Sequence, residues 1–219
     1  MNADLLSNWL EWLPDLGRGL QTSVLLAAVS LAIGIPIGLL LAVLVSSRRA
    51  AIRMPSIVLV EIGRGTPALV VLQLVYFGLP NAGLTLGPFT AASAALALTT
   101  AAYTSEIIRG GLEAVPKGEV EASQALGMSY RDTMRFVLIP QGMRIAIPAL
   151  VGFGILMFQA TSLAFTISLQ ELLSRAYSIG SSTFLYFQVL LLAGVLYLAI
   201  TLPSGWLTGR LERRLSRHL

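Results

Sequence analysis

Residues 113–142 read EAVPKGEVEASQALGMSYRDTMRFVLIPQG, and this polar stretch separates two long apolar segments. A connection of about 30 residues without structure of its own is uncommon inside a compact domain. This stretch carries start and stop signals for helices. It therefore predicts a structured loop that has a function beyond joining its neighbours.

The first half of the loop predicts one short helix. Pro116 suits the start of a helix, and Ala122 and Ala125 recur at helical spacing on a small apolar face. Gly127 suits the left-handed backbone position that ends a helix.

The second half predicts another helix. Ser129 is a good N-cap, and Asp132 follows three residues later, near the positive end of the helix. Phe136 lies on an apolar side, and Pro140 is expected to end the helix. The outer surface of such a helix-turn-helix suits docking into a groove of another protein. The alternative is a loop that merely connects two helices.

The composition places the chain in a membrane. Hydrophobic residues make up 55% of it, charged residues only 12%, and the mean hydropathy is +0.77. A soluble domain carries about 25% charged residues. At 219 residues the chain is expected to form one domain, 1–219, with the loop at 113–142 inside it.

Five apolar segments are long enough to cross a bilayer as helices. They cover residues 19–46, 55–79, 89–110, 144–169 and 184–209. The first 18 residues carry Trp9 and Trp12 and predict either a short amphipathic helix lying in the outer interface or a disordered tail.

The basic residues give the five segments a direction, because Lys and Arg collect on the cytoplasmic side of a membrane. They cluster after the first and fifth segments and between the third and fourth: Arg48, Arg49, Arg53, Arg109, Lys117, Arg131, Arg135, Arg144, Arg210, Arg213, Arg214 and Arg217. This predicts the N-terminus outside, the C-terminus inside and the 113–142 loop in the cytoplasm. The net charge of +4 thus has a topological meaning and does not indicate nucleic-acid binding.

No metal site is expected. The chain has no Cys, and its one His, His218, lies in the basic tail, where it is expected to be solvated.

Charged residues within the apolar segments are expected to pair. Glu61 and Arg64 stand three apart on the second segment, and Glu106 and Arg109 stand three apart on the third. An unpaired charge at the middle of a membrane helix costs about 2.5–3.5 kcal/mol. Structural pairs near the cytoplasmic rim are favoured; a gate or direct substrate contact is the alternative. Thr66, between Gly65 and Pro67, marks a local break.

The fourth segment contains one polar turn, Gln159-Ala160-Thr161-Ser162. Hydrogen-bonding groups at that depth are expected to face the interior of the bundle. The turn is read as lining of a translocation pathway, the alternative being helix packing through small residues. In the first segment, Gly34 and Gly38 are spaced to let another helix come close.

The loop resembles the Glu-Ala-Ala loop of bacterial ABC importer permeases. Glu121-Ala122-Ser123, then Gly127, then Val137-Leu138-Ile139-Pro140 match that pattern in spacing throughout, with conservative departures at Ser123, Val137 and Ile139. The resemblance implies that this loop couples the permease to ATPase subunits. The coupling residues are then Glu119, Glu121, Ala122, Ser123, Gly127, Val137 and Pro140.

The rest of the chain is similar to the polar amino acid subfamily of these permeases. Glu61–Pro67, Tyr76–Pro80, Arg109–Leu112, Thr161–Leu163 and Glu171–Leu173 carry the resemblance. It implies a type I importer fold, a homodimeric or heterodimeric permease, two cytoplasmic ATPase subunits, an external amino-acid-binding protein and a place in the bacterial inner membrane.

The chain itself is not expected to be an enzyme. It has no Gly-x4-Gly-Lys-Ser/Thr phosphate loop, so ATP and Mg are expected on the partner ATPases. Many relatives carry a carboxylate where this chain has Ala160. The substrate is therefore expected to be neutral or acidic, unless the partner permease supplies that group. The alternative functions are an ion-coupled secondary transporter, which usually needs more spans and internal repeats, and a membrane scaffold without transport.

Overall fold

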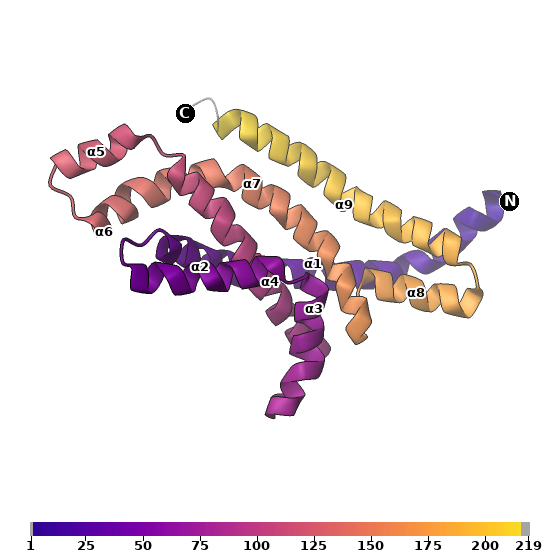
Figure 1. Cartoon of the computed structure of the whole chain (residues 1–219). Coiled ribbons are helices and arrows are strands. Elements are labelled where there is room, and N and C mark those ends of the chain that lie inside the picture. Colours follow the sequence, from indigo (N-terminus) through magenta and orange to yellow (C-terminus); the bar gives the residue numbers. More distant parts are fainter. Residues whose placement is uncertain (1, 216–219) are drawn as a thin grey trace.

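The computed structural model describes residues 2–215, and every regular element in that range is a helix (Figure 1). Arg217 and His218 lie outside the described residues. Of the η elements, η1 and η3 are π-helical, while η2 and η4 are 3₁₀ helices. The elements are α1 (Asn2–Val45), α2 (Ala50–Gly65), α3 (Ala68–Gln73), η1 (Leu74–Gly78), η2 (Leu79–Ala82), α4 (Pro88–Glu113), α5 (Lys117–Ala125), α6 (Tyr130–Asp132), η3 (Thr133–Leu138), α7 (Ile139–Ala160), η4 (Thr161–Ile167), α8 (Leu172–Thr183) and α9 (Tyr186–Leu215).

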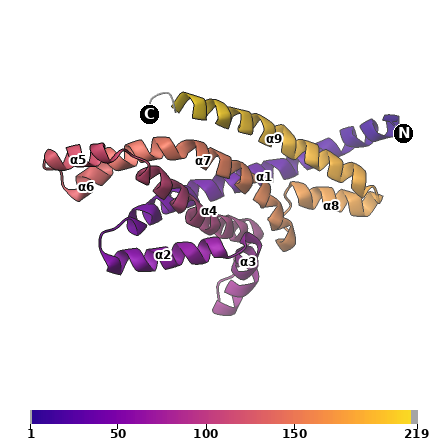
Figure 2. The same ribbon diagram turned by 45° about the horizontal axis from the view of Figure 1, so that its top comes forward.

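Three helices in the described range are long and apolar enough to cross a membrane: Leu5–Val45, Tyr130–Ile167 and Tyr186–Arg210. A bent pair, Ala50–Gly65 with Ala68–Ala82, adds a fourth if it is counted as one span. The bend of 98° falls at the break that Gly65 and Pro67 predict (Figure 2). Pro67 cannot donate a backbone hydrogen bond, and Thr66 already has an extended backbone.

The third predicted segment is α4, which is 26 residues long but rich in Ala, Thr and Ser rather than in Leu and Ile. It is the central helix of the fold, because it packs against α1, α2, α3 and α7. Most of its residues are buried by protein, so it needs small side chains that let neighbours come close more than it needs a lipid-facing surface.

The contact between α1 and α4 depends on two glycines. A Cβ atom built on Gly34 would lie 2.4 Å from the Cβ of Thr100, and one on Gly38 would lie 2.1 Å from the Thr104 hydroxyl oxygen. The prediction that these glycines admit another helix is confirmed, and α4 is that helix.

The expected separate helix in the first 18 residues is wrong, and so is the disordered tail, because α1 runs without interruption from Asn2 to Val45. Trp12 and Leu16 are buried against Leu172 of α8 and Val189 of α9. These contacts with α8 and α9 stabilise the helix over residues 2–18, before the predicted membrane-spanning segment 19–46.

The expectation that Pro140 ends a helix is also wrong. The helix continues from Tyr130 through η3 into α7, and Pro140 lies in the first turn of α7, directly after the π-helical η3. Local widening of the helix is one way to accommodate a proline and the backbone hydrogen bond that it removes. The fourth predicted segment therefore belongs to a helix that begins well before residue 144.

The two ends of the molecule differ. Figures 1 and 2 both show α5 and α6 projecting at the end opposite the N-terminus, where α1 gives way to α2. The start of α1 lies with α8 and the beginning of α9 at the other end (Figure 1). The clusters of basic residues at 48–53 and 131–135 therefore lie at the same end of the fold.

Candidate functional site

The helical hairpin at 117–132 is the first candidate site, and local sequence signals shape it. Gly127 has φ +75°, the left-handed conformation that ends α5, and the Ser129 hydroxyl accepts the N–H of Asp132 at 3.2 Å. Ser123 and Thr133 are both buried and join their hydroxyl oxygens across the hairpin at 3.0 Å. The two predicted helices, the turn and the N-cap are confirmed.

The outer face of the hairpin mixes charge with apolar surface. Glu121 and Ala122 are exposed, and Leu126 is 82% exposed. Glu119 is held at the base of the hairpin, where its carboxylate accepts the Gln141 side-chain amide at 3.1 Å. A projecting hairpin that offers an exposed leucine and carboxylates on its outer face suits docking into a groove of another protein.

The remaining predicted coupling residues lie just after the hairpin, where its second helix continues into η3 and α7. Val137 is half-buried in the π-helical η3, and Pro140 is exposed at the start of α7. Their role in coupling stays a prediction.

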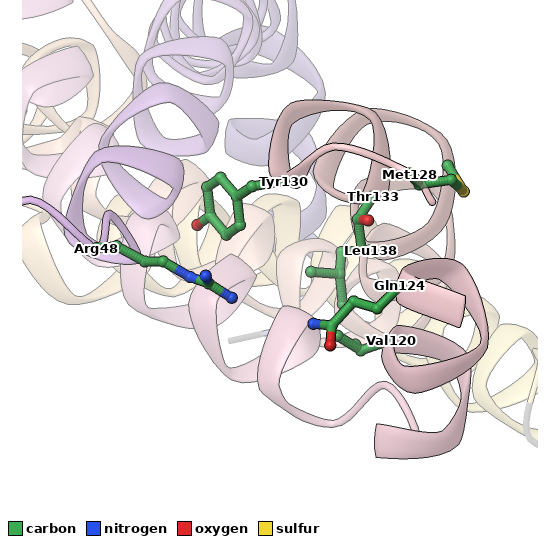
Figure 3. A pocket seen from close by; sticks show the side chains of 7 residues that line it. All are labelled: Arg48, Val120, Gln124, Met128, Tyr130, Thr133 and Leu138. Carbon is green, nitrogen blue, oxygen red and sulfur yellow. The ribbon is translucent and has the colours of Figure 1, made fainter. Parts of the chain in front are cut away.

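The hairpin is anchored to the end of α1. The Tyr130 hydroxyl donates to the Ser46 carbonyl at 3.0 Å, and the Arg48 guanidinium lies 5.1 Å from the centroid of the Tyr130 ring. Figure 3 shows both side chains at the edge of a cavity of about 210 Å³ between α5, η3 and the α1–α2 turn, with Gln124 on the opposite wall. These contacts join the hairpin to a membrane helix, so a force on the hairpin reaches α1 directly.

A second link lies where the hairpin joins the bundle. A Cβ on Gly111 of α4 would lie 2.5 Å from the Gly142 carbonyl oxygen, and one on Gly142 would lie 2.7 Å from the Leu112 side chain. The end of α4, where the chain leaves the bundle, and the start of α7, where it returns, are therefore in direct backbone contact. The base of the hairpin is thus packed tightly at the contact between α4 and α7.

The charged residues of α2 and α4 form one chain of ion pairs. Arg109 binds Glu106 through two nitrogens, at 2.8 and 3.0 Å, and reaches Glu113 at 2.6 Å. Arg64 lies 3.4 Å from Glu61 and 3.5 Å from Glu106. Both predicted pairs are confirmed, but the contact between Arg64 and Glu106 and the participation of Glu113 were not predicted.

This ion-pair chain lies beside the break in the second segment. The Tyr103 hydroxyl donates to the Arg64 carbonyl at 3.1 Å, and the Thr66 hydroxyl donates to the Ile62 carbonyl at 2.7 Å. A cavity of about 310 Å³ opens between Ser46 and the carboxylates of Glu61 and Glu106. The network therefore ties the α2–α3 bend to α4 and, through Glu113, to the entrance of the hairpin.

Replacing Arg109 by Gln is expected to lower the free energy of unfolding by about 1–2 kcal/mol, because half-buried Glu106 loses the two-nitrogen contact that is its strongest and exposed Glu113 loses its partner as well. Glu61→Gln is the control: Glu61 is 65% exposed and makes one 3.4 Å contact, so its loss should change stability by less than about 0.5 kcal/mol. Thermal unfolding of the detergent-purified proteins measures both. Equal stability of the two variants would contradict the role assigned to Arg109.

The polar turn of the fourth segment straddles the change from α-helix to 3₁₀ helix at Ala160 and Thr161. Gln159 is exposed, and Ala160 and Ser162 are half-buried. Thr161 has 0% exposure, and its hydroxyl donates to the Phe158 carbonyl at 2.7 Å. Thr161 therefore faces the interior of the protein, as expected for the polar turn, and its place in a pathway stays a prediction.

Glu171 lies behind this turn and was not assigned a role from the sequence. It is fully buried and caps α8: its carboxylate accepts the N–H groups of Leu173 and Ser174 at 2.9 and 2.7 Å and the hydroxyls of Ser23 and Tyr197 at 3.3 Å each. Burial raises the pKa of Glu171, and the two N–H donors act in the opposite direction. A lone glutamate just before Leu172 in an otherwise uncharged stretch was the only available signal.

Among the side chains that the structure describes, those of residues 5–210 and 213, no group of three or more His, Cys, Asp or Glu residues could hold a metal ion. The carboxylates of the ion-pair chain are paired with arginines, and the Glu171 carboxylate already accepts hydrogen bonds from its neighbours.

The sequence matches known proteins over nearly its whole length. The pattern of the family described as "Binding-protein-dependent transport system inner membrane component" matches residues 34–217. A probable amino-acid ABC transporter permease protein of Bacillus subtilis, YckA, is 35% identical over 96% of this chain and 93% of its own length. The glutamine transport system permease protein GlnP of Escherichia coli is 34% identical over 93% of this chain and 94% of its own length.

Solved structures agree with these sequence matches. The crystal structure of an amino acid ABC transporter with histidines contains a chain that superposes with a TM-score of 0.89 at 35% identity, covering 98% of this chain and 100% of that one. A chain of the MetNI methionine ABC transporter in an inward-facing conformation superposes with a TM-score of 0.69 at 20% identity, covering 93% of this chain and 95% of that one. The second likeness shows the fold alone.

Proposed function

Because the chain belongs to the family of binding-protein-dependent transport system inner membrane components, we propose that it lines the translocation pathway of an amino acid importer in the bacterial inner membrane. The family consists of membrane permease subunits, so the chain is a transport subunit and not an enzyme. Its fold is that of a type I ABC importer permease.

The single observation that carries the coupling role is the hairpin. Its outer face presents Glu121 and Leu126, and its base is fixed to α1 through Tyr130 and to α4 and α7 through Gly111 and Gly142. A clamped hairpin acts as a rigid lever. A partner protein bound to the outer face of the hairpin would move several membrane helices together.

The partners follow from the family and from the relatives' names. We expect a second permease, identical or homologous, two cytoplasmic ATPase subunits that bind ATP and Mg, and an extracytoplasmic protein that delivers the amino acid. Movement of the ATPase pair is transmitted through the hairpins, and the permease pair rocks between inward-open and outward-open states.

The polar turn suggests the class of amino acid. Gln159 is exposed on the turn, while Ala160 supplies no carboxylate. A carboxylate is the group that best recognises a cationic side chain, since opposite charges attract strongly where water is excluded. The proposed substrate is therefore a neutral or acidic amino acid, unless the second permease contributes an acidic group.

Uptake in proteoliposomes tests the function. The chain, assembled with its ATPase subunits and binding protein, is expected to accumulate glutamine or glutamate when ATP is enclosed, and not with a non-hydrolysable analogue. Uptake driven by an ion gradient in the absence of nucleotide would contradict the proposal and favour a secondary transporter.

Cysteine labelling tests the pathway, and the chain is naturally free of cysteine. Gln159→Cys is expected to react with a charged, membrane-impermeant thiol reagent in the assembled transporter, because Gln159 is exposed. Thr161→Cys is expected to react at least tenfold more slowly in this conformation, because Thr161 is fully buried. Labelling is followed by mass shift. Absence of labelling at residue 159 in every transport state would remove Gln159 from the pathway.

A further inference from the structure

A second cavity, of about 550 Å³, lies at the cytoplasmic end predicted for the bundle, next to the one in Figure 3. It is formed by the end of α1, the α1–α2 turn and the start of α6. The residues that line it are Val43, Leu44, Ser47, Arg48, Arg49, Ile52, Ser129, Tyr130 and Arg131.

Its polar side is basic. Three guanidinium groups line it, those of Arg48, Arg49 and Arg131, and no carboxylate does. None of the three has an ion-pair partner among the side chains that the structure describes, those of residues 5–210 and 213, and Arg48 lies over the face of the Tyr130 ring. The neighbouring acid, Asp132, accepts the Ser129 hydroxyl at 2.6 Å and does not line the cavity.

A helix N-terminus adds to this charge. α2 begins at Ala50, its N-cap Arg49 makes no side-chain cap, and the first turn contains no acidic residue. The first N–H groups of a helix without a cap are free to bind an anion. Three arginines therefore line a common space, and the uncapped start of α2 lies beside it.

The other side of the cavity is apolar. Val43 and Leu44 lie in the last turn of α1, whose membrane-spanning part is Leu5–Val45, and Ile52 of α2 is partly exposed. This places a hydrocarbon wall directly beside a basic pocket at the level where a membrane helix ends. A ligand that fits must carry an anionic head and an apolar chain.

We propose that this cavity binds an anionic phospholipid, with the phosphate held by Arg48, Arg49 and Arg131 and an acyl chain lying along Val43 and Leu44. Basic pockets between membrane helices on the cytoplasmic side are suited to such headgroups. The lipid bridges the α1–α2 turn and the hairpin, because Arg131 belongs to the hairpin and the other two arginines do not. It stiffens the same joint that Tyr130 and Ser46 form.

The test measures bound lipid on the purified full-length chain, without partners. The protein is extracted from bilayers of phosphatidylcholine with phosphatidylglycerol and examined by native mass spectrometry. We expect about one retained phosphatidylglycerol per chain, and at least a fivefold loss in the triple variant Arg48→Gln, Arg49→Gln, Arg131→Gln. The matched control, Arg135→Gln, Arg210→Gln, Arg213→Gln, removes the same charge from residues that do not line the cavity and should retain the lipid.

Three outcomes would overturn the proposal. Equal loss of lipid in the control triple would show a general effect of surface charge. Equal retention in all three proteins would show that the cavity is not a site. Displacement of the lipid by soluble glycerophosphoglycerol at millimolar concentration would show that the headgroup alone is bound. A triple variant with Lys at the three positions keeps the charge and is expected to retain the lipid, which separates binding from misfolding.

A consequence for transport rests on the proposed function. In the assembled transporter, ATP-driven uptake is expected to rise at least threefold when phosphatidylglycerol is added to phosphatidylcholine, and the Gln triple should lose this response. Retained lipid without any ATP-driven uptake would leave the site standing and refute the importer assignment.

Discussion

Leu126→Glu is expected to abolish ATP-driven uptake while the protein still folds and inserts. Leu126 is 82% exposed at the tip of the hairpin, so the substitution breaks no contact within the chain. In an interface its side chain would be buried in a pocket of the ATPase. A charge placed in such a pocket costs several kcal/mol, and each 1.4 kcal/mol weakens binding about tenfold.

The measurement is uptake and ATPase activity in proteoliposomes, together with co-purification of the ATPase. Leu126→Met is the matched control, because it keeps an apolar side chain of similar size and should keep at least half of the activity. Glu121→Lys reverses a charge on the same exposed face and is expected to act in the same direction as Leu126→Glu. Undiminished uptake by both Leu126→Glu and Glu121→Lys would show that the ATPase docks elsewhere.

The second large effect is expected from Gly34→Ala, a change of one methyl group. The added Cβ would lie 2.4 Å from the Cβ of Thr100 and 2.8 Å from the Ala97 carbonyl oxygen. Neither atom can rotate away, because one is fixed to the backbone and the other belongs to it. The two central helices must therefore move apart. Overpacking of this kind costs about 1–3 kcal/mol.

Gly17→Ala is the matched control in the same helix, since an added Cβ there meets nothing within 4 Å. Ala is a better helix former than Gly by about 1 kcal/mol, so this variant should be slightly more stable than the parent protein. Gly34→Ala should lower the melting temperature by roughly 4–10 °C. Thermal unfolding in detergent measures both. A shift of the same sign in both variants would contradict the close α1–α4 contact as the cause.

The hairpin is the part of the candidate site that could be predicted best from the sequence, because its signals are local. Gly127 adopts the left-handed conformation and Ser129 caps the following helix as expected, and both depend on residues within four positions. The pairs Glu61 with Arg64 and Glu106 with Arg109 were equally predictable, since each joins residues one helical turn apart.

The two errors have different causes, one local and one a contact between distant residues. Pro140 carried a stop signal, but the π-helical η3 before it lets the helix continue. The helix at residues 2–18 could not be assigned to α1 because its burial depends on α8 and α9. The different exposure of Gln159 and Thr161 could not be predicted, because the sequence does not say how this helix is rotated.

The sequence by itself determined that the chain is helical and membrane-bound, that its second segment breaks between Gly65 and Pro67, and that a capped hairpin separates two spans. These properties follow from hydropathy, chain length and residues within a turn of one another. Only the tertiary structure decided how the helices are rotated and which distant groups meet, as Arg64 with Glu106, Tyr130 with Ser46 and Glu171 with Tyr197 do. In a membrane, lipid-facing and protein-facing sides are both apolar, so hydropathy cannot fix the rotation of a helix, and close contact between particular side chains fixes it instead.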